Sequence, residues 1–450
     1  MRAARGNNSN QGAFVSATVS ATAHPSAVAQ YGERPIDPLS KGLGPLPAAS
    51  TALADAGALQ WNLLREDISL PAAVLSAERL AHNLQWMQQF VSEYRVQLAP
   101  HGKTTMAPKL FRMQLAAGAW GITLATPPQV QAAYHGGVRR VLMANQLVGR
   151  QNMAMIAGLL HDPDFEFFCV IDSVDNVNQL GAFFQQAGRP LNVLLEIGCT
   201  GGRSGVRNLA QRDAVLTALA HWPDALKLAG VELYEGVLDD EHAVRAMLKQ
   251  AVNWTAELMQ GGIFARSPAL LSGAGSVWFD LVAEEFQPLQ IHGALEIVLR
   301  PGCYLTHDAG IYRHAQVGVL QRSAVARRIG AELKPALQIW AYVTSLPEPG
   351  HAIIGLGRRD AGSASGFPIA ARHYRPGTEA PVEIEVTRNW EVFKMMDQHT
   401  FLRIAVLDDV KVGDMIAFDV SHPCLTFDKW RQLLVVDANY DVTEVLETYF

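Results

Sequence analysis

The chain has 450 residues, of which 49% are apolar and 18% are charged, and its formal net charge at pH 7 is −6. This composition is typical of a globular protein with a large core and excludes a disordered chain, while the negative charge disfavours a nucleic-acid partner. No apolar run reaches the ~18 residues of a membrane helix, so we expect neither nucleic acid nor a membrane as a partner. The cysteines lie far apart without a CxxC pair, which argues against a disulfide framework and against a four-cysteine zinc site, and favours a cytoplasmic location. They are Cys169, Cys199, Cys303 and Cys424.

The first sixty residues differ from the rest in composition. They are rich in Ala, Ser, Gly, Asn and Pro and show neither a helical nor an alternating apolar period. We therefore expect a flexible, low-complexity extension over residues 1–60. The polar run from Asn7 to Gln11 interrupts the place where the apolar block of a secretory signal would begin.

From about Leu70, short runs rich in Val, Ile and Leu alternate with longer segments of helical period, as in repeated strand and helix units. Ser173–Ala187 is typical of the helical segments, with Ser173 as a candidate cap and Gly188 after the last turn. Eight such units predict an α/β fold, a (β/α)8 TIM barrel over residues 61–315, with functional residues where the strands end. An open doubly wound sheet is the competing fold. The predicted strands are Val96–Pro100, Ile122–Ala125, Arg140–Asn145, Phe165–Asp172, Asn192–Ile197, Leu228–Leu233, Ala269–Ser272 and Leu295–Leu299.

After about Ile311, runs of Val, Ile and Thr are separated by Pro and Gly, which predicts a β-rich C-terminal domain over residues 316–450. The segment Trp61–Ser76 is a candidate to cross back and complete it. The strands predicted here are Ala336–Ser345, Ala352–Gly357, Val382–Val386, Phe401–Val406, Met415–Val420 and Leu433–Asp437.

One lysine stands at the predicted mouth of the barrel. Lys103 lies in the segment Ala99–Thr105, which ends the first barrel strand. A lysine that is desolvated, or that lies near other positive charges, can be partly neutral and can form a Schiff base with an aldehyde cofactor. From the local pattern alone, a solvated loop lysine is the alternative.

Small residues follow the seventh barrel strand. The segment comprises Ser272, Gly273, Ala274, Gly275 and Ser276 and precedes a predicted helix. Backbone amides at a helix N-terminus bind anions, and the loops after strands seven and eight of barrels often bind phosphate. An ordinary glycine-rich connection is the alternative.

A third candidate site lies in the β-rich domain. His422 and Cys424 alternate along an extended segment, so the imidazole and the thiolate could point the same way and bind one metal ion. Two ligands leave positions open for water or substrate, as Lewis-acid catalysis requires. A half-buried histidine beside a buried free thiol is the alternative.

These segments together resemble the fold-type III pyridoxal-phosphate enzymes, and within them the D-threonine aldolase and D-serine dehydratase group, which also has an alanine racemase N-terminal-like barrel. The resemblance runs from about Leu70 to the C-terminus. Its markers are Pro100-His101-Gly102-Lys103-Thr104, Glu196-Ile197-Gly198 with Arg203-Ser204-Gly205-Val206, Ser272-Gly273-Ala274-Gly275-Ser276, Arg300-Pro301-Gly302-Cys303-Tyr304 and His422-Pro423-Cys424.

The resemblance implies that Lys103 binds pyridoxal 5'-phosphate covalently and that residues Ser272 to Ser276 surround its phosphate. It also implies positions near the cofactor or substrate for Gln146, Arg203, Tyr234 and Tyr304. Two departures stand out. Thr105 occupies a position where the family often has histidine, and the methyl group of Ala274 would lie close to the phosphate.

The resemblance also implies the reaction. His-x-Cys is the metal pair of the eukaryotic-like D-serine dehydratases, whereas D-threonine aldolases have His-x-Asp, and a soft thiolate favours zinc. Cys424 therefore favours a lyase that converts a D-3-hydroxy amino acid, such as D-serine or D-threonine, to a 2-oxo acid and ammonia. Aldol cleavage to glycine and an aldehyde is the alternative, and a non-catalytic carrier of the cofactor is a further one. A racemase would leave His422 and Cys424 unexplained. Related enzymes imply a homodimer.

Overall fold

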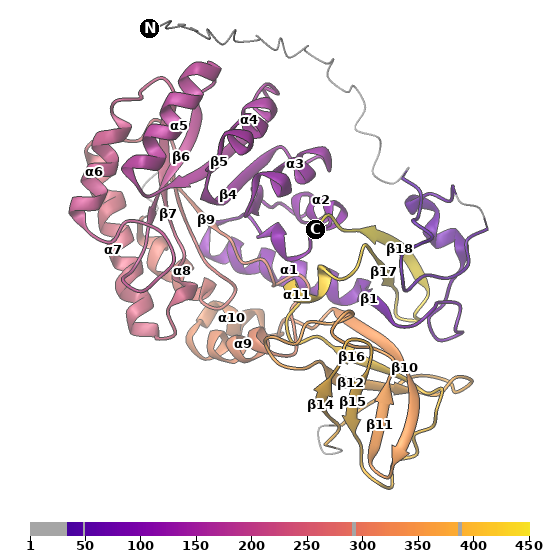
Figure 1. Ribbon diagram of the computed structural model, residues 1–450. Helices are drawn as coiled ribbons and strands as arrows, with labels where there is room; N and C mark the ends of the chain where they lie inside the picture. Colours follow the sequence, from indigo (N-terminus) through magenta and orange to yellow (C-terminus); the bar gives the residue numbers. More distant parts are fainter. Residues whose placement is uncertain (1–33, 48–49, 290–293, 386–388) are drawn as a thin grey trace, which may run out of the picture.

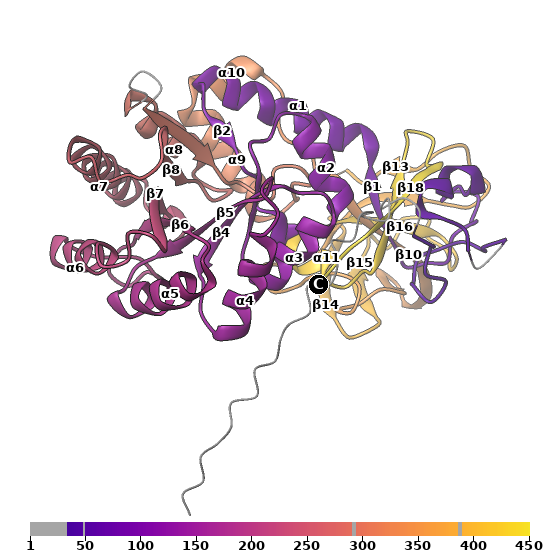
Figure 2. The same ribbon diagram turned by 90° about the horizontal axis from the view of Figure 1, so that it is seen from above.

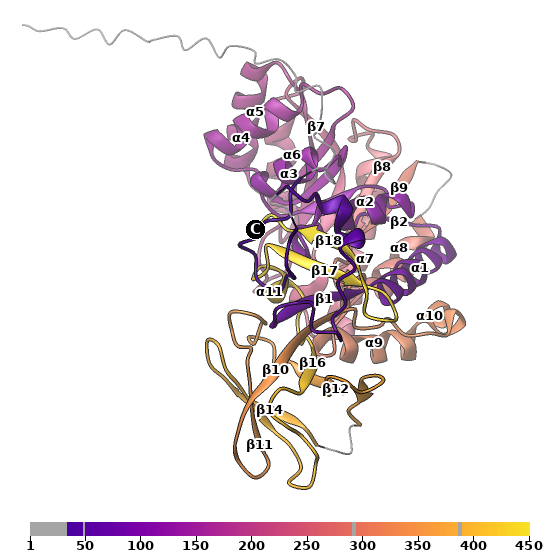
Figure 3. The same ribbon diagram turned by 90° about the vertical axis from the view of Figure 1, so that its right-hand side faces the viewer.

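The computed structural model describes residues 34–47, 50–289, 294–385 and 389–450 of the chain (Figure 1). Within them, one sheet is parallel and is surrounded by helices, while a second, mixed sheet forms most of the remainder. The helices around the parallel sheet and the long hairpins of the mixed sheet lie at opposite ends of the molecule (Figures 2 and 3). No helix in the described ranges combines the length and the apolar character needed to cross a membrane.

The parallel sheet closes into the predicted barrel. Its strand order is β2-β9-β8-β7-β6-β5-β4-β3, and a parallel bridge between His101 and Thr123 joins the end of β2 to β3. All eight predicted strands are present among the described residues, so the barrel is confirmed and the open sheet is not. The strands are β2 (Gln97–Leu98), β3 (Ile122–Leu124), β4 (Arg140–Gln146), β5 (Glu166–Ile171), β6 (Leu191–Ile197), β7 (Leu226–Leu233), β8 (Ala269–Gly273) and β9 (Leu295–Leu299).

The helix that the sequence predicted in most detail follows the capping rules. In α5 (Val174–Ala187), the Ser173 hydroxyl accepts a hydrogen bond from the Asn176 amide, and Gly188 ends the helix with a left-handed conformation. The other helices are α1 (Ala77–Tyr94), η3 (Gly102–Thr104), α2 (Pro108–Ala116), α3 (Pro127–His135), α4 (Arg150–Leu159), α6 (Leu209–Leu219), η4 (Glu235–Val237), α7 (Glu241–Gln260), α8 (Phe279–Phe286), η5 (Gln287–Leu289), α9 (Ile311–Arg322) and α10 (Ala324–Ile329).

Side chains fill the barrel interior. Buried residues of successive strands and of the segments next to them form one cluster: Ala99, Trp120, Leu142, Ala144, Phe168, Val170, Leu194, Ala229, Leu270 and Val298. Because this interior is a packed core, substrate can reach the barrel only at one of its ends.

The mixed sheet contains most of the predicted β-rich domain. Its strand order is β13-β12-β16-β10-β1-β17-β18, and β11, β15 and β14 extend it from β10. Strand β1 (Ala72–Ser76) comes from before the barrel and pairs with β10 and β17, so the segment that precedes the barrel does cross back. The other elements are β10 (Leu337–Glu348), β11 (His351–Ile354), β12 (Ile369–Tyr374), β13 (Val382–Glu383), β14 (Glu391–Met395), β15 (Thr400–Arg403), β16 (Met415–Asp419), α11 (Cys424–Phe427), β17 (Gln432–Val436) and β18 (Val442–Glu447).

The described part of the N-terminal sixty residues is packed against this sheet. Ile36 is fully buried, and η2 (Leu53–Leu59) contributes Leu53 and Ala56 to the same apolar cluster. The amine of Lys41 lies 2.6 Å from a carboxylate oxygen of Asp360. The expectation of a flexible extension is therefore wrong for residues 34–47 and 50–60, because irregularly spaced apolar residues give no period although they are buried. Residues 1–33 lie outside the described part.

Candidate active site

The candidate residues of the barrel lie where its strands end. Lys103 is in η3, the element that follows β2, Gln146 closes β4, and Tyr234 follows β7. The segment from Ser272 to Ser276 begins in the last two residues of β8. These positions share the carboxyl end of the barrel, where parallel strands place catalytic groups in other barrels.

The amine of Lys103 is in an environment that favours its neutral form. The side chain is accessible to water, yet the surrounding protein desolvates it and lowers its pKa, and the positive charges of Arg203 and Arg300 lower the pKa further. Negative charge on the sulfur of Cys424 or Cys303 would act in the opposite direction and raise the pKa of Lys103. A partly neutral amine can attack a carbonyl carbon or accept a proton.

A buried polar group stands on the β6 side of the site. The Glu196 carboxylate accepts hydrogen bonds from the Gln146 amide and from the Ser204 hydroxyl, the second at 2.7 Å. Burial raises the pKa of Glu196. The residue before Ser204, Arg203, places its guanidinium 4.9 Å from the ring centre of Tyr234. The structure thus brings Gln146, Arg203 and Tyr234 to one side of the barrel mouth.

An ion pair that was not assigned from the sequence lies behind these residues. Arg300 binds the carboxylate of Glu232, and both side chains are almost fully buried. Burial raises the pKa of Glu232 to about 7, although Arg300 acts in the opposite direction. The Nε atom of Arg300 is buried without a hydrogen-bond partner in the described chain. In the sequence, the signal that could have identified this pair is that both residues lie where a predicted strand ends, Glu232 in β7 and Arg300 after β9.

The predicted phosphate segment is held in place by the chain itself. The backbone amides of Ala274 and Gly275 donate to the carboxylate of Glu235, at 3.1 and 2.6 Å.

The side chains of the segment also form hydrogen bonds within the chain. The Ser276 hydroxyl accepts from the amides of Gly302 and Cys303. Ser272 is fully buried and donates to a backbone carbonyl of β9, and Gly273 lies beside it in β8. Two of the expected anion donors are therefore already engaged.

The same segment still offers amides in front of α8. The backbone amides of Ser276 and Val277 lie just before the first turn of α8. Within the described ranges, neither amide donates a hydrogen bond. Ala274 has a φ of 78°, the left-handed conformation that glycine usually adopts. The segment therefore fits an anion through Ser276 and Val277 more directly than through Ala274 and Gly275.

Tyr304 differs from the other candidates because it is part of the core. Its side chain is 2% exposed, and its hydroxyl is hydrogen-bonded to the amide of Gln114 in α2, at 3.1 Å. Burial raises its pKa. These contacts give Tyr304 a packing role.

The β-rich domain brings His422 and Cys424 to the same end of the barrel. Cys424 begins α11 and donates a hydrogen bond of 3.4 Å to the hydroxyl of Thr104, the neighbour of Lys103. A hydrogen bond to Cys424 raises the pKa of His422, and the nearby carboxylate of Asp308 acts in the same direction. The Nδ1 atom of His422 and one oxygen of Asp308 are buried without partners in the part of the chain that the structure describes.

These donors suit a metal ion with open positions. Imidazole nitrogen and thiolate sulfur are typical zinc ligands. In the described ranges, no three His, Cys, Asp or Glu side chains form a group that could hold a metal ion. His422 and Cys424 therefore fit an open site and do not form a closed structural site.

A second thiol, unassigned from the sequence, lies in this group. Cys303 follows β9 and is 3% exposed, and its sulfur is 3.6 Å from that of Cys424. The ring of Tyr312 lies 5.7 Å from that of His422, so α9 also contributes to this region. The two cysteines are 121 residues apart in the chain, and no spacing rule could predict their contact.

Comparison with known proteins gives two family matches, which cover different parts of the chain. Residues 75–288 match the family described as alanine racemase, N-terminal domain. Residues 336–436 match the family described as putative serine dehydratase domain. The two matches correspond to most of the barrel and most of the mixed sheet.

Two curated relatives and one solved structure are among the most similar proteins. The D-threonine aldolase of Arthrobacter sp is 26% identical over 311 residues, which are 67% of this chain and 75% of the relative. The D-threo-3-hydroxyaspartate dehydratase of Delftia sp. (strain HT23) is 27% identical over 255 residues, 56% of this chain and 64% of the relative. The crystal structure of D-threonine aldolase from Filomicrobium marinum has a TM-score of 0.71 at 22% identity, and covers 86% of this chain and 97% of that one.

Two further structures are variants of a D-threo-3-hydroxyaspartate dehydratase. One has alanine in place of a histidine, and the other has alanine in place of a cysteine two positions later and is in a metal-free form. The spacing of the two changed residues is that of His422 and Cys424 in this chain.

Proposed function

The chain belongs to the fold-type III pyridoxal-phosphate enzymes, and we propose that it is a metal-dependent lyase that converts a D-3-hydroxy amino acid, such as D-serine or D-threonine, to a 2-oxo acid and ammonia. The observation that carries this proposal is the contact between the two domains at the barrel mouth. Lys103 and the His422–Cys424 pair come from different domains, yet Cys424 is hydrogen-bonded to the residue that follows Lys103.

The barrel supplies the groups that would hold the cofactor. When bound, pyridoxal phosphate stabilises negative charge at the α carbon of an amino acid. Lys103 would bind its aldehyde carbon, and the amides of Ser276 and Val277 would bind its phosphate. Because its pKa is lowered, the Lys103 amine can accept the α proton of the substrate at a pH where an ordinary lysine is charged. Arg203 supplies a positive charge near this amine and a partner for a carboxylate.

The β-rich domain supplies the groups that would help the hydroxyl leave. His422 and Cys424 would hold a divalent metal, for which the soft thiolate favours zinc. A Lewis acid next to the β hydroxyl stabilises the charge that develops as hydroxide leaves. Loss of the α proton and of this hydroxide gives an enamine, which water converts to the 2-oxo acid and ammonia.

Aldol cleavage is the second candidate, because one of the similar curated proteins is a D-threonine aldolase and another is a 3-hydroxy-D-aspartate aldolase. In that reaction a base removes the hydroxyl proton and the bond between the α and β carbons breaks. The cysteine at position 424 is the feature that favours dehydration. The non-catalytic carrier is disfavoured, because the curated relatives are lyases.

Product analysis separates these functions. The protein, loaded with pyridoxal phosphate and zinc, is incubated with each enantiomer of serine, threonine and threo-3-hydroxyaspartate, with and without a chelator. We expect a 2-oxo acid and ammonia from at least one D substrate, and loss of both products with the chelator. Release of glycine and an aldehyde would reject the dehydratase in favour of the aldolase. The absence of all these products would reject both functions. The homodimer implied by the resemblance stays a prediction, which light scattering tests.

A further inference from the structure

Two thiols from different domains are in van der Waals contact at the barrel mouth. The sulfur atoms of Cys303 and Cys424 are 3.6 Å apart. The hydroxyl of Thr104 lies 3.7 Å from the sulfur of Cys303 and 3.4 Å from that of Cys424. A disulfide bond is ~2 Å long, so the sulfurs need to approach by only about 1.5 Å to become bonded.

The two cysteines differ in accessibility and in freedom to move. Cys424 is partly exposed, whereas Cys303 is 3% exposed. Cys303 follows Gly302, where a Cβ atom would lie 2.5 Å from the carbonyl oxygen of His101, so this backbone is tightly packed. Cys424 begins the single turn α11, whose next residue, Leu425, is 38% exposed. Cys424 is therefore the thiol that an oxidant reaches first and the one that can move.

From this geometry we propose that Cys303 and Cys424 are a peroxide-sensitive pair that forms a reversible disulfide between the barrel and the β-rich domain. The Cys424 thiolate attacks one oxygen of hydrogen peroxide, forms a sulfenic acid and releases hydroxide. The Cys303 sulfur then attacks the Cys424 sulfur and the second oxygen leaves as water. In total, two thiols and one peroxide give one disulfide and two waters, and a dithiol reductant reverses the change.

The disulfide would switch off the proposed lyase, and this step rests on the proposed function. A sulfur bonded to Cys303 is no longer a thiolate ligand, so His422 would lose its partner in metal binding. The bond would also hold α11 against the segment after β9, where the sulfur of Cys303 lies 3.7 Å from the hydroxyl of Thr104, the neighbour of Lys103. The cross-link itself does not depend on any activity of the protein.

Peptide mapping of the full-length protein tests the cross-link directly. The protein is treated with a chelator and then with hydrogen peroxide, its remaining thiols are alkylated, and its peptides are identified by mass. We expect two of the four cysteines to lose their thiols and to appear as one linked pair, Cys303 with Cys424. Incubation with dithiothreitol should restore all four. Retention of all four thiols, a pair that includes Cys169 or Cys199, or a bond between two chains would overturn the proposal.

Two variants and one added metal extend this test. Cys303→Ser should form no linked pair and should leave Cys424 as a sulfenic or higher acid, whereas Cys199→Ser should form the pair as the unchanged protein does. Because a metal-bound Cys424 is protected, we expect zinc to slow the cross-link. If the pair forms equally fast with zinc, the disulfide proposal is supported but Cys424 is not a metal ligand. The test therefore distinguishes a wrong metal assignment from a wrong cross-link.

Discussion

The charges around Lys103 determine the pH at which its amine becomes reactive. Desolvation and the guanidinium groups of Arg203 and Arg300 lower its pKa, so the neutral amine is present at a lower pH than in a free lysine. We expect the rate of covalent capture of pyridoxal phosphate to rise with pH around a midpoint below 10.5. In Arg203→Gln, which removes one of the lowering charges, this midpoint should move upward.

Borohydride trapping at a series of pH values, followed by mass measurement of the labelled chain, gives the midpoint. Arg212→Gln is the control, because Arg212 lies on α6 and pairs with Asp213 and Glu257. An unchanged midpoint in Arg203→Gln would show that this guanidinium does not act on the amine.

Lys103 and Cys303 illustrate what sequence reasoning finds at the scale of single residues. Lys103 lies in a local motif at the end of an apolar run, so its position at the barrel mouth could be predicted from neighbouring residues. Cys303 was part of a motif, but its contact with Cys424 depends on how the two domains dock. A contact of this kind has no local pattern, and the same holds for the carboxylate of Glu235 on the amides of the phosphate segment.

At the scale of elements, the segment before β1 is part of the folded core. Ile36 is fully buried, whereas Leu39, three residues later, is 87% exposed. We expect Ile36→Ala to reduce the free energy of unfolding by about 3 kcal/mol, since it leaves a cavity in the apolar cluster. Leu39→Ala should change it by less than about 0.5 kcal/mol. Urea denaturation of both variants measures the difference, and equal effects would contradict the packed position of this segment.

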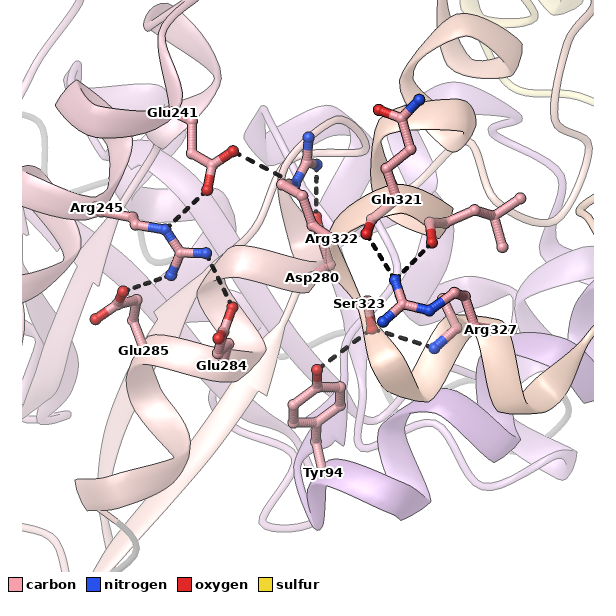
Figure 4. Close-up of polar contacts among 12 residues, drawn as sticks. Tyr94, Glu241, Arg245, Asp280, Glu284, Glu285, Gln321, Arg322, Ser323 and Arg327 are labelled. Carbon is pink, nitrogen blue, oxygen red and sulfur yellow. Dashed lines mark hydrogen bonds and ion pairs between the residues drawn. The ribbon is translucent and has the colours of Figure 1, made fainter.

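The helices α8 and α9 are joined by a partly buried ion pair (Figure 4). Arg322 contacts Asp280, whose side chain is 2% exposed, and also lies 4.9 Å from the ring centre of Trp278. Arg245 of α7 instead binds the more exposed carboxylates of Glu241, Glu284 and Glu285. We expect Arg322→Gln to destabilise the protein by about 3 kcal/mol because it leaves a buried carboxylate unpaired.

Arg245→Gln is the matched comparison and should change the stability by no more than about 1 kcal/mol. The effect of Arg322→Gln should be smaller at low pH. Without Arg322 the remaining burial raises the pKa of Asp280, so protonation removes the unpaired charge as the pH falls. Thermal unfolding of both variants at two pH values measures this difference. If the destabilisation by Arg322→Gln does not depend on pH, its cause is the lost packing of Arg322 against Trp278.

The barrel strands could be predicted and three strands of the mixed sheet could not, for one physical reason. Strands of a parallel barrel are covered on both sides and form continuous apolar runs. The missed strands β12, β14 and β18 have exposed or half-buried positions along them, so polar residues interrupt their pattern. Strand β14, for example, buries only Val392 and Met395.

At the scale of the molecule, the two domains supply different parts of one site. The mixed sheet contains β1 from before the barrel and β10 to β18 from after it, so the chain enters and leaves the barrel through this domain. This connection fixes α11 against η3, the turn that carries Lys103. In the proposed function, the groups for the cofactor and those for the metal therefore belong to different domains, although they meet in space.

This division predicts that the two binding functions can be lost separately. Cys424→Ala should lower the bound zinc per chain and the release of 2-oxo acid by at least about tenfold, and should leave the covalent capture of pyridoxal phosphate intact. Lys103→Ala should abolish that capture and keep the zinc. Metal analysis and borohydride trapping on the same preparations measure both properties, and each variant is the control for the other. Loss of both properties in either variant would mean that the barrel mouth and α11 fold as one interdependent unit, whereas zinc and activity that survive in Cys424→Ala would leave this cysteine as a packing thiol.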